Sequence, residues 1–385
     1  MITKEEIEFI RENIHENVHE LGLKTHRFEK ERMGFLLNQI KARQKTEKKL
    51  PSWKDKFELI FSSMLAAEQC SSDVTANYKS KIAPGKKMVD LTGGLGVDIL
   101  AFSKTFDKCI HLERNKETQQ AAAHNFKIMN AHTITSHCIE AETFLEESKE
   151  KFDLVYIDPA RRQGERKVFD FSLCEPDVIK LQSLLKIKTE KIIIKASPMI
   201  TIQDGLKQLD SVSEIHIISH KNECKEILFL QDFKTSINHI QVYCQELETE
   251  HHLSVKLADC NLGLSRGKGR FIFDPFVSYR KAGLASFLGM KHHLSALTEE
   301  GSLLTGDTYI EEFPGRIFEI IEEMDYSAKT LKKSGVSKAH IISRGYSQHS
   351  DEIRKKLKVK DGGDFFVFVY KNDKKKSKLL LCERR

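Results

Sequence analysis

The chain has 385 residues, of which 40% are hydrophobic and 31% are charged, and its formal net charge is +6. This length predicts two or three domains, and the composition is not that of a disordered chain. The eight cysteines form no Cys-x-x-Cys pair, which argues against a zinc site and a disulfide framework. Apolar runs are only strand-sized, and the first residues lack the pattern of a secretion signal. We therefore expect a cytoplasmic protein with no metal site and no membrane contact.

Positive charge is concentrated near the C-terminus. Residues 321–385 contain 17 Lys or Arg against 9 Asp or Glu, an excess of eight, so the rest of the chain carries about −2 of the total of +6. A basic unit on a nearly neutral body suggests attachment to a polyanion. The alternative is a solvated surface with a lysine-rich turn.

Residues 1–80 are predicted to form an N-terminal helical region. Apolar residues recur every three or four positions in residues 3–21, in residues 26–43 and from Phe57 to Leu65, which predicts three amphipathic helices. A fourth helix is expected after Ser71-Ser72, because a serine pair before an acidic residue is typical of a helix N-cap. This region is interpreted as a cap or an accessory bundle.

Strands and helices alternate in residues 81–235, which predicts an α/β fold with a doubly wound, Rossmann-like seven-stranded sheet. The last two strands are close enough in sequence to pair as an antiparallel edge. The expected strands are residues 88–91, 109–113, 134–139, 152–158, 191–195, 214–219 and 226–230.

The remaining residues predict small α+β domains. In residues 236–320 the expected elements are strands at 240–247, 253–257 and 271–273 and a helix at 278–287. In residues 321–385 they are a strand at 339–342, a basic helix at 350–357 and a hairpin of 365–370 with 378–382.

A glycine-rich turn follows the first strand of the expected sheet. Asp90, Gly94 and Gly96 form the pattern D-x-x-x-G-x-G, which is usual for S-adenosylmethionine (SAM) sites. It lacks the third glycine of G-x-G-x-x-G and the Gly-Lys-Ser/Thr of a Walker A loop. Glycines allow a ligand to lie against the backbone, although a tight strand-to-helix turn is the alternative reading. The predicted cofactor-binding residues here are Asp90, Thr92, Gly93, Gly94 and Gly96.

Acidic residues follow the next two strands. Glu113 ends the second strand, where a carboxylate can accept both hydroxyl groups of a ribose. Glu140 follows the third strand, where an acid could meet the amino group of an adenine, and Glu142 is the alternative. Glu113 and Glu140 are therefore added to the predicted cofactor site.

The segment Asp158-Pro159-Ala160-Arg161-Arg162 is the most distinctive motif. It follows the expected central strand, beside the point where open sheets bind ligands. Amino-methyltransferases have [DN]-P-P-[YF] here, and this chain keeps Asp158 and Pro159 but lacks the aromatic residue that would stack on a flipped base. Asp158 and the Pro159 carbonyl are predicted to orient an acceptor. Arg161 and Arg162 are predicted to bind a substrate phosphate or carboxylate, with structural salt bridges as the alternative.

Lys195 ends the fifth strand and should lie near Asp158. It is a candidate general base, or it forms an ion pair at the strand ends. A Lys-Asp-Lys-Glu set typical of ribose 2′-O-methyltransferases would add Glu226 and either Lys79 or Lys81.

Taken together, these motifs resemble a bacterial family of class I SAM-dependent methyltransferases with a C-terminal THUMP-like domain. The segments that carry the resemblance are 68–72, 78–79, 90–98, 158–162, 174–177, 195–198, 313–318 and 357–364. The resemblance implies a methyltransferase domain in residues 81–235, a ferredoxin-like domain in residues 236–320 and a THUMP-like domain in residues 321–385. The sheet is also similar to that of the trimethylguanosine synthase group.

The resemblance further implies the cofactor SAM and, because THUMP domains bind structured RNA, a tRNA or rRNA partner at the basic C-terminal domain. We therefore expect methylation of an RNA nucleotide. Two alternatives are a SAM- and RNA-binding protein without catalysis, and a methyltransferase of a small anionic substrate bound by Arg161 and Arg162.

Overall fold

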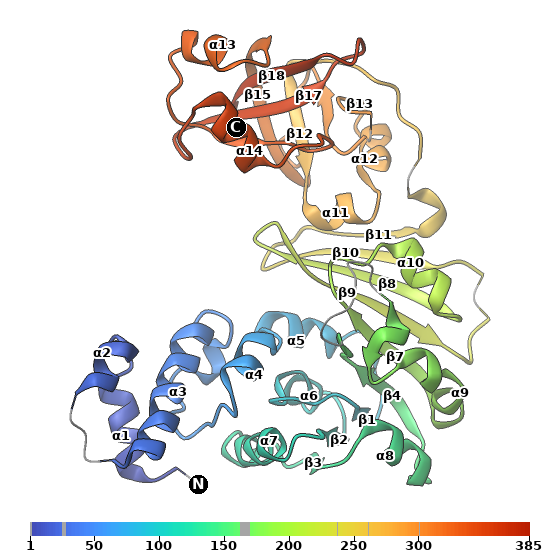
Figure 1. Cartoon of the computed structure of the whole chain (residues 1–385). Helices are drawn as coiled ribbons and strands as arrows, with labels where there is room; N and C mark the ends of the chain where they lie inside the picture. The colour runs from blue at the N-terminus through green and yellow to red at the C-terminus, as the bar shows by residue number, and fades with distance from the viewer. Residues whose placement is uncertain (1, 25–27, 162–169, 237, 261, 300) are drawn as a thin grey trace. The chain divides into compact units, whose positions relative to one another are not determined.

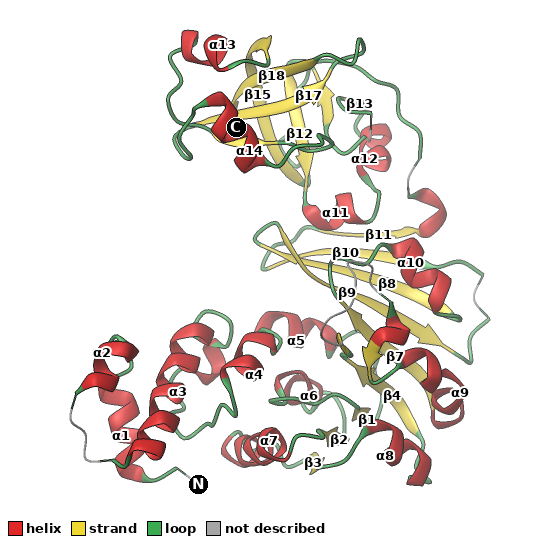
Figure 2. Ribbon diagram, in the orientation of Figure 1, coloured by secondary structure: helices red, strands yellow, loops and turns green. Residues whose placement is uncertain are grey.

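The computed structural model describes residues 2–24, 28–161, 170–236, 238–260, 262–299 and 301–385 (Figure 1). These residues form two compact units. The first comprises Met1–Glu214 and Ile227–Asn238, and the second comprises Ile215–Glu226 and His239–Arg385. Figure 2 shows helices alternating with strands along most of the first unit, whereas the second consists mainly of antiparallel strand pairs.

Helices form the N-terminal part of the first unit. They are α1 (Lys4–Glu12), α2 (Val18–Leu23), α3 (Lys30–Thr46), a 3₁₀ turn (Pro51–Trp53), α4 (Met64–Gln69) and α5 (Asp73–Lys79). Helix α5 begins where the serine pair predicts it, because the Ser72 hydroxyl accepts from the Thr75 N–H in a capping box.

Two expectations for this region are wrong. The first predicted helix is divided into α1 and α2, because Asn13 ends one helix and the Asn17 side chain caps the start of the next. The stretch from Phe57 to Ser63 is not helical. There the N–H and C=O of Ile60 bond to the Asn125 side chain, and those of Phe61 bond to the Gln39 side chain. Such side-chain partners satisfy the backbone outside a helix, and apolar spacing does not reveal them.

A twisted sheet with parallel central strands organises the rest of the first unit. Its strands are β1 (Lys87–Asp90), β2 (Lys108–Leu112), β3 (Ile134–His137), β4 (Phe152–Ile157), β7 (Thr189–Ala196) and β9 (Glu223–Asp232), in the order β9-β7-β4-β1-β2-β3. The first five pair in parallel, and β9 is antiparallel to β7. With β8 (Val212–His220) beside β9, these are the seven expected strands. The α/β prediction is confirmed.

Helices cover both faces of this sheet. They are α6 (Val97–Phe102), α7 (Lys116–Ile128), α8 (Ala141–Glu147), α9 (Val178–Lys188) and α10 (Ile202–Gln208). Helices α6 and α7 lie on one face, and α8 and α9 lie on the other (Figure 1). The central strands are therefore almost fully buried, as expected for a parallel sheet. Beyond β4, the short strand β5 (Ala160–Arg161) pairs with β6 (Cys174–Glu175), which follows a 3₁₀ turn (Phe171–Leu173).

Strands β8 and β9 form a hairpin, and the part of it from Ile215 to Glu226 belongs to the second unit. Strands β10 (Gln241–Leu247) and β11 (His252–Lys256) pair antiparallel, and β10 lies next to β8 in the strand order. In the described residues this sheet therefore has nine strands instead of the seven predicted. A 3₁₀ turn (Leu257–Asp259) follows β11.

A seven-stranded sheet forms the rest of the second unit. Its strands, in the order β13-β14-β12-β15-β18-β17-β16, are β13 (Ser295–Ala296), β14 (Leu304–Gly306), β12 (Phe271–Pro275), β15 (Gly315–Asp325), β18 (Ser377–Arg384), β17 (Phe365–Lys371) and β16 (His340–Ile342). The helices are α11 (Val277–Lys281), α12 (Ala285–Lys291), α13 (Ala328–Lys333) and α14 (Ser350–Leu357).

Two details of this unit differ from the expected elements. The single helix predicted at residues 278–287 is divided into α11 and α12, because the chain turns at Gly283 with φ of +75°. Residues 320 and 321, between which a domain boundary is expected, both lie inside β15. That strand pairs with β12 on one side and β18 on the other, so the two segments share one sheet.

Candidate active site

The glycine turn lies at the carboxyl end of β1 and is fixed by the Thr92 side chain. The Thr92 hydroxyl accepts from the backbone N–H of Asp158, at 2.7 Å, and donates to Asp90 Oδ1, at 3.3 Å. The Thr92 N–H also donates to Asp90 Oδ1, at 3.0 Å. Thr92 therefore joins the end of β1 to the segment that follows β4.

Two of the three glycines in the turn are required by packing, and the third is not. A Cβ at Gly93 would lie 2.2 Å from the His111 ring, and one at Gly96 would lie 2.4 Å from the Phe126 ring. Packing therefore requires both glycines. Gly94 has φ of +53°, and a Cβ there would meet no atom closer than 4.0 Å. Of the three, only Gly94 leaves open space above the backbone.

Asp90 is almost fully buried at the base of the turn, with 1% of its surface exposed. Burial raises the pKa of its carboxyl group to about 8, and the nearby Asp98 and Asp158 add to the rise, although the hydrogen bonds from Thr92 oppose it. The carboxyl group is therefore mainly protonated at neutral pH. A cation bound beside it would favour the ionised form.

Glu113 and the glycine turn are joined directly. Glu113 Oε2 accepts from the Gly94 N–H, at 3.0 Å, and Oε1 accepts from the Asn115 N–H, at 2.7 Å. Beneath the turn, the His111 ring bonds to the Gly94 carbonyl and to the Ser136 hydroxyl. Burial lowers the pKa of His111 to about 4, so this ring is neutral and supports the turn from below.

Asp158 and Lys195 meet at the carboxyl ends of β4 and β7. Lys195 Nζ lies 2.5 Å from Asp158 Oδ2, and the side chains are 15% and 35% exposed. The pairing of Ile157 with Ile194 places the next residue of each strand at the same edge. The structure thus brings together two of the residues predicted for catalysis, as an ion pair.

The other predicted residues that the structure describes lie on other elements of the first unit. Glu140 is exposed at the N-cap of α8, and its side chain makes no cap hydrogen bond. Arg161 lies in β5, where its backbone pairs with Cys174. Arg162 lies outside the residues that the structure describes. Arg114, which the sequence does not single out, forms an ion pair with Glu175 beside β5.

Comparisons with known proteins show what the chain is similar to. A family model described as "Conserved hypothetical protein 95" matches residues 73–214, and a model described as "THUMP domain-like" matches residues 315–384. Two curated relatives, from two Mycobacterium tuberculosis strains, are uncharacterised SAM-dependent methyltransferases. Each is 22% identical over 309 residues, covering 79% of this chain and 82% of the relative. The crystal structure of a proposed methyltransferase from Porphyromonas gingivalis W83 is 27% identical, with a TM-score of 0.84 and coverage of 100% and 99% of the two chains.

The chain is a SAM-dependent methyltransferase with a THUMP-like C-terminal domain. The cofactor of this methyltransferase is SAM. In the part of the chain that the structure describes, no helix is long and apolar enough to cross a membrane, and no three His, Cys, Asp or Glu side chains are grouped as a metal site. All eight cysteines are free thiols.

A buried ionic cluster beside the glycine turn was missed in the sequence. Lys79 Nζ lies 2.9 Å from Asp98 Oδ1 and 2.8 Å from the Ser71 hydroxyl, and the Ser71 and Tyr156 hydroxyls donate to Asp98 Oδ2. Burial opposes ionisation of Asp98, but Lys79 holds its pKa below the usual value. The Lys79 side chain is fully buried, so it cannot serve in a Lys-Asp-Lys-Glu set at an acceptor. Spacing could not reveal this cluster, because its members come from four separate segments.

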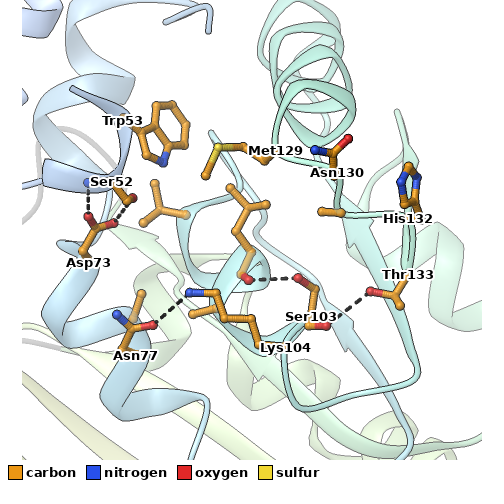
Figure 3. Close-up of a pocket in the computed structure, with 15 residues that line it drawn as sticks. Ser52, Trp53, Asp73, Asn77, Ser103, Lys104, Met129, Asn130, His132 and Thr133 are labelled. Carbon is orange, nitrogen blue, oxygen red and sulfur yellow. Dashed lines mark hydrogen bonds between the residues drawn. The ribbon is translucent and has the colours of Figure 1, made fainter. Parts of the chain in front are cut away.

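A cavity of about 400 Å³ lies in the first unit, away from the predicted site residues (Figure 3). Its wall includes Trp53, Asn77, Lys104, Met129 and His132, which come from the 3₁₀ turn Pro51–Trp53, from α5, from the residues after α6 and α7, and from the turn before β3. That turn is at the amino end of a strand, whereas ligands of open α/β sheets bind at the carboxyl ends. The cavity contains none of the predicted site residues.

Proposed function

We propose that this methyltransferase methylates a nucleotide of an RNA, with the acceptor bound between Asp158 and the glycine turn. One observation carries the proposal: the same chain contains the site at the carboxyl ends of the parallel strands and a basic THUMP-like domain. Class I sheets of this kind support many substrates, so the C-terminal domain supplies the argument for RNA.

The cofactor fits the residues at the carboxyl ends of β1 and β2. The open space over Gly94 admits a ligand to the backbone, and Glu113 stands beside it with both carboxylate oxygens at the rim of the turn. Glu113 would accept the ribose hydroxyls, and Asp90 would face the cationic methionine end, which favours its ionised form. Thr92, Gly93 and Gly96 would hold the turn in shape, and Glu140 would face the adenine. SAM supplies a methyl group on a sulfonium centre.

Asp158 and the Pro159 carbonyl would hold the acceptor group. Both are hydrogen-bond acceptors, so they would bind the N–H or O–H hydrogens of the acceptor and leave its lone pair directed at the methyl group. Pro159 has no N–H and keeps its own backbone from competing. Lys195 already donates to Asp158, and an ammonium group has no lone pair to take a proton. Lys195 would therefore position Asp158 rather than act as the general base. Alignment of this kind supplies much of the rate of a displacement.

The basic C-terminal domain would bind RNA chiefly through phosphates, so binding should weaken steeply with salt. Arg161 and Arg162 would contact a phosphate near the acceptor. The same two arginines could serve a small anionic substrate, and charge substitutions in the C-terminal domain separate the two functions. Replacing the exposed Lys374, Lys375 and Lys376 by Gln should weaken RNA modification but spare the modification of a small molecule.

The test is to incubate the full chain with methyl-labelled SAM and with separate tRNA, rRNA and protein fractions, and to digest any labelled fraction to its modified component. Label in an RNA nucleotide is expected. SAM binding with no label in any fraction would contradict the proposal and favour a binding protein without catalysis. Label confined to protein or to a small molecule would contradict the RNA substrate alone.

A further inference from the structure

A buried carboxylate in the second unit is surrounded by three arginines. Asp274 has no exposed side-chain surface, and Oδ1 lies 2.6 Å from Arg280 Nη1 while Oδ2 lies 2.5 Å from Arg316 Nη2. Arg344 Nε lies 4.0 Å from Oδ1. These four residues are called the Asp274 cluster below.

The fold of this unit determines the Asp274 cluster. Asp274 and Arg316 face each other across β12 and β15, Arg280 comes from α11, and Arg344 follows the end of β16. Gly315 is required beside it, because a Cβ there would lie 2.3 Å from the Asp274 carbonyl oxygen. The segment Phe313–Phe318, a matching motif without a role in the site at the glycine turn, thus builds this cluster.

The charges of the Asp274 cluster are not balanced. Three guanidinium groups share one carboxylate, and among the described residues no other carboxylate lies within 4.0 Å of these arginines. Burial lowers the pKa of Arg280 to about 10, and Arg316 and Arg344 lower it further although Asp274 opposes this. Half-buried like charges are costly unless a further anion joins them.

Two of the arginines are open to such an anion. The Arg344 side chain is 41% exposed and that of Arg316 is 23% exposed. The buried Nε of Arg344 has no hydrogen-bond partner. Arg280, at 10% exposed, donates to Asp274 and to the Pro275 carbonyl. Planar guanidinium groups that diverge from one carboxylate can bind the oxygens of a phosphate in pairs.

Aromatic rings border the Asp274 cluster. The Arg316 guanidinium lies 5.4 Å from the centre of the Phe318 ring. Phe318 contacts Phe366 at 4.9 Å, and Phe366 stacks on His340 at 5.0 Å between ring centres. His340 is 44% exposed, so this chain of rings reaches the surface. A cation beside stacking rings is a common arrangement for a nucleotide whose base is unpaired.

We propose that Arg316 and Arg344 bind a backbone phosphate of the RNA substrate, with Asp274 holding the two guanidinium groups in position and Arg280 holding Asp274. This rests on the proposed function, since it names where the RNA binds the second unit. His340 would stack on a neighbouring base.

The test measures binding of the full chain to end-labelled tRNA by fluorescence anisotropy across a series of salt concentrations. Arg344→Gln and Arg316→Gln should each weaken binding about tenfold and lower the slope of log affinity against log salt by about one. The matched control is Arg354→Gln, because Arg354 lies in the same unit but between two carboxylates, Asp351 and Asp361. The control should change affinity less than about twofold. Thermal unfolding would verify that each variant is folded, and Arg344→Lys should restore part of the affinity.

The outcomes separate this inference from the proposed function. Wild-type affinity and slope in folded Arg344→Gln, or an equal loss in Arg354→Gln, would overturn the assignment of the Asp274 cluster while leaving RNA methylation intact. Absence of RNA binding by the wild-type chain would overturn both. In that case inorganic phosphate that raises the Tm of the wild type, but not of Arg344→Gln, would assign the cluster to a phosphate ligand other than RNA.

Discussion

Lys195 and Asp158 form an ion pair of 2.5 Å at the carboxyl ends of two adjacent parallel strands. Asp158 is also tied to the glycine turn, because its N–H donates to the Thr92 hydroxyl. Asp158 is therefore held at two points, because Lys195 on β7 holds its carboxylate and the turn after β1 holds its backbone. A group held in this way can align an acceptor without having to be a strong base.

This arrangement predicts that substitutions of Asp158 and of Lys195 lower kcat to different extents. Asp158→Asn should lower kcat about 100-fold or more, because one carboxylate acceptor is replaced by a donor facing Lys195. Lys195→Met should cause a smaller loss of kcat, since Asp158 remains but is less well oriented. SAM affinity should change little in either variant. Single-turnover methyl transfer and equilibrium SAM binding measure the two quantities.

The matched control is Asp210→Asn, because Asp210 also pairs with a lysine, Lys186, but on the surface and away from the glycine turn. It should leave kcat unchanged. Equal activity of Asp158→Asn and Asp210→Asn would mean that the strand-end pair is only structural.

Asp90 predicts a dependence of stability on pH. Its pKa rises from 3.8 to about 8 on folding, so above pH 3.8 the unfolded chain releases a proton that the folded chain retains. This group therefore lowers the free energy of unfolding as pH rises from 4 to 8, by up to about 1.4 kcal/mol per pH unit, and has no further effect above pH 8. In Asp90→Asn this decline should be absent. Urea unfolding of both proteins between pH 4 and 8 measures the difference.

The same group predicts proton release on cofactor binding. At pH 7, a cationic ligand beside Asp90 would ionise the carboxyl group, so the apparent binding enthalpy of SAM should vary with the ionisation enthalpy of the buffer. Asp90→Asn should abolish that variation. Parallel stability curves together with buffer-independent enthalpies in the wild type would show that Asp90 is ionised without ligand.

The grouping of the residues at the strand ends could be predicted from the sequence, because one rule of parallel sheets determines it. Parallel strands end at the same edge of a sheet, so Asp90, Asp158 and Lys195 had to be neighbours once the strands were assigned. The different reasons for the glycines could not be predicted, since they depend on the rings of His111 and Phe126. Those rings reach the turn only through the packing of β2 and α7.

Contacts between distant segments were also beyond prediction. Lys79 and Asp98 are separated by 18 intervening residues and meet because α5 packs on α6, where no spacing rule applies. Likewise, the arginines around Asp274 come from separate elements, and only Arg344 lies in the basic residues 321–385. Composition predicts the net charge of a surface but not where three cations share one anion.

The Lys79–Asp98 pair predicts a large loss of stability when one partner is removed. Lys79→Met should lower the free energy of unfolding by about 3–5 kcal/mol, because it leaves a buried carboxylate without its cation. The double variant Lys79→Met with Asp98→Leu should recover much of this loss. Urea unfolding measures all three proteins, and Lys186→Met, at an exposed pair, should cost less than about 1 kcal/mol. A loss in Lys79→Met as small as in Lys186→Met would contradict the prediction.

In the glycine turn, we expect Gly96→Ala to affect mainly the stability of the fold and Gly94→Ala to affect mainly SAM binding. Gly96→Ala should destabilise the fold by more than about 2 kcal/mol, since the residue has φ of +83° and its Cβ would overlap the Phe126 ring. Gly94→Ala should cost only about 1 kcal/mol, for its φ of +53°, because no atom opposes the new methyl group. That methyl group would instead occupy the open space of the cofactor, so SAM affinity should fall at least tenfold.

Calorimetry of SAM binding and thermal unfolding measure both effects in each variant. Phe126→Leu combined with Gly96→Ala should recover part of the stability, because a smaller side chain makes room for the new Cβ. SAM affinity in that double variant should stay close to the wild-type value. Unchanged SAM affinity in Gly94→Ala would mean that the cofactor does not lie against this turn, and the site would then have to be sought along the rim formed by Glu113 and Asp158.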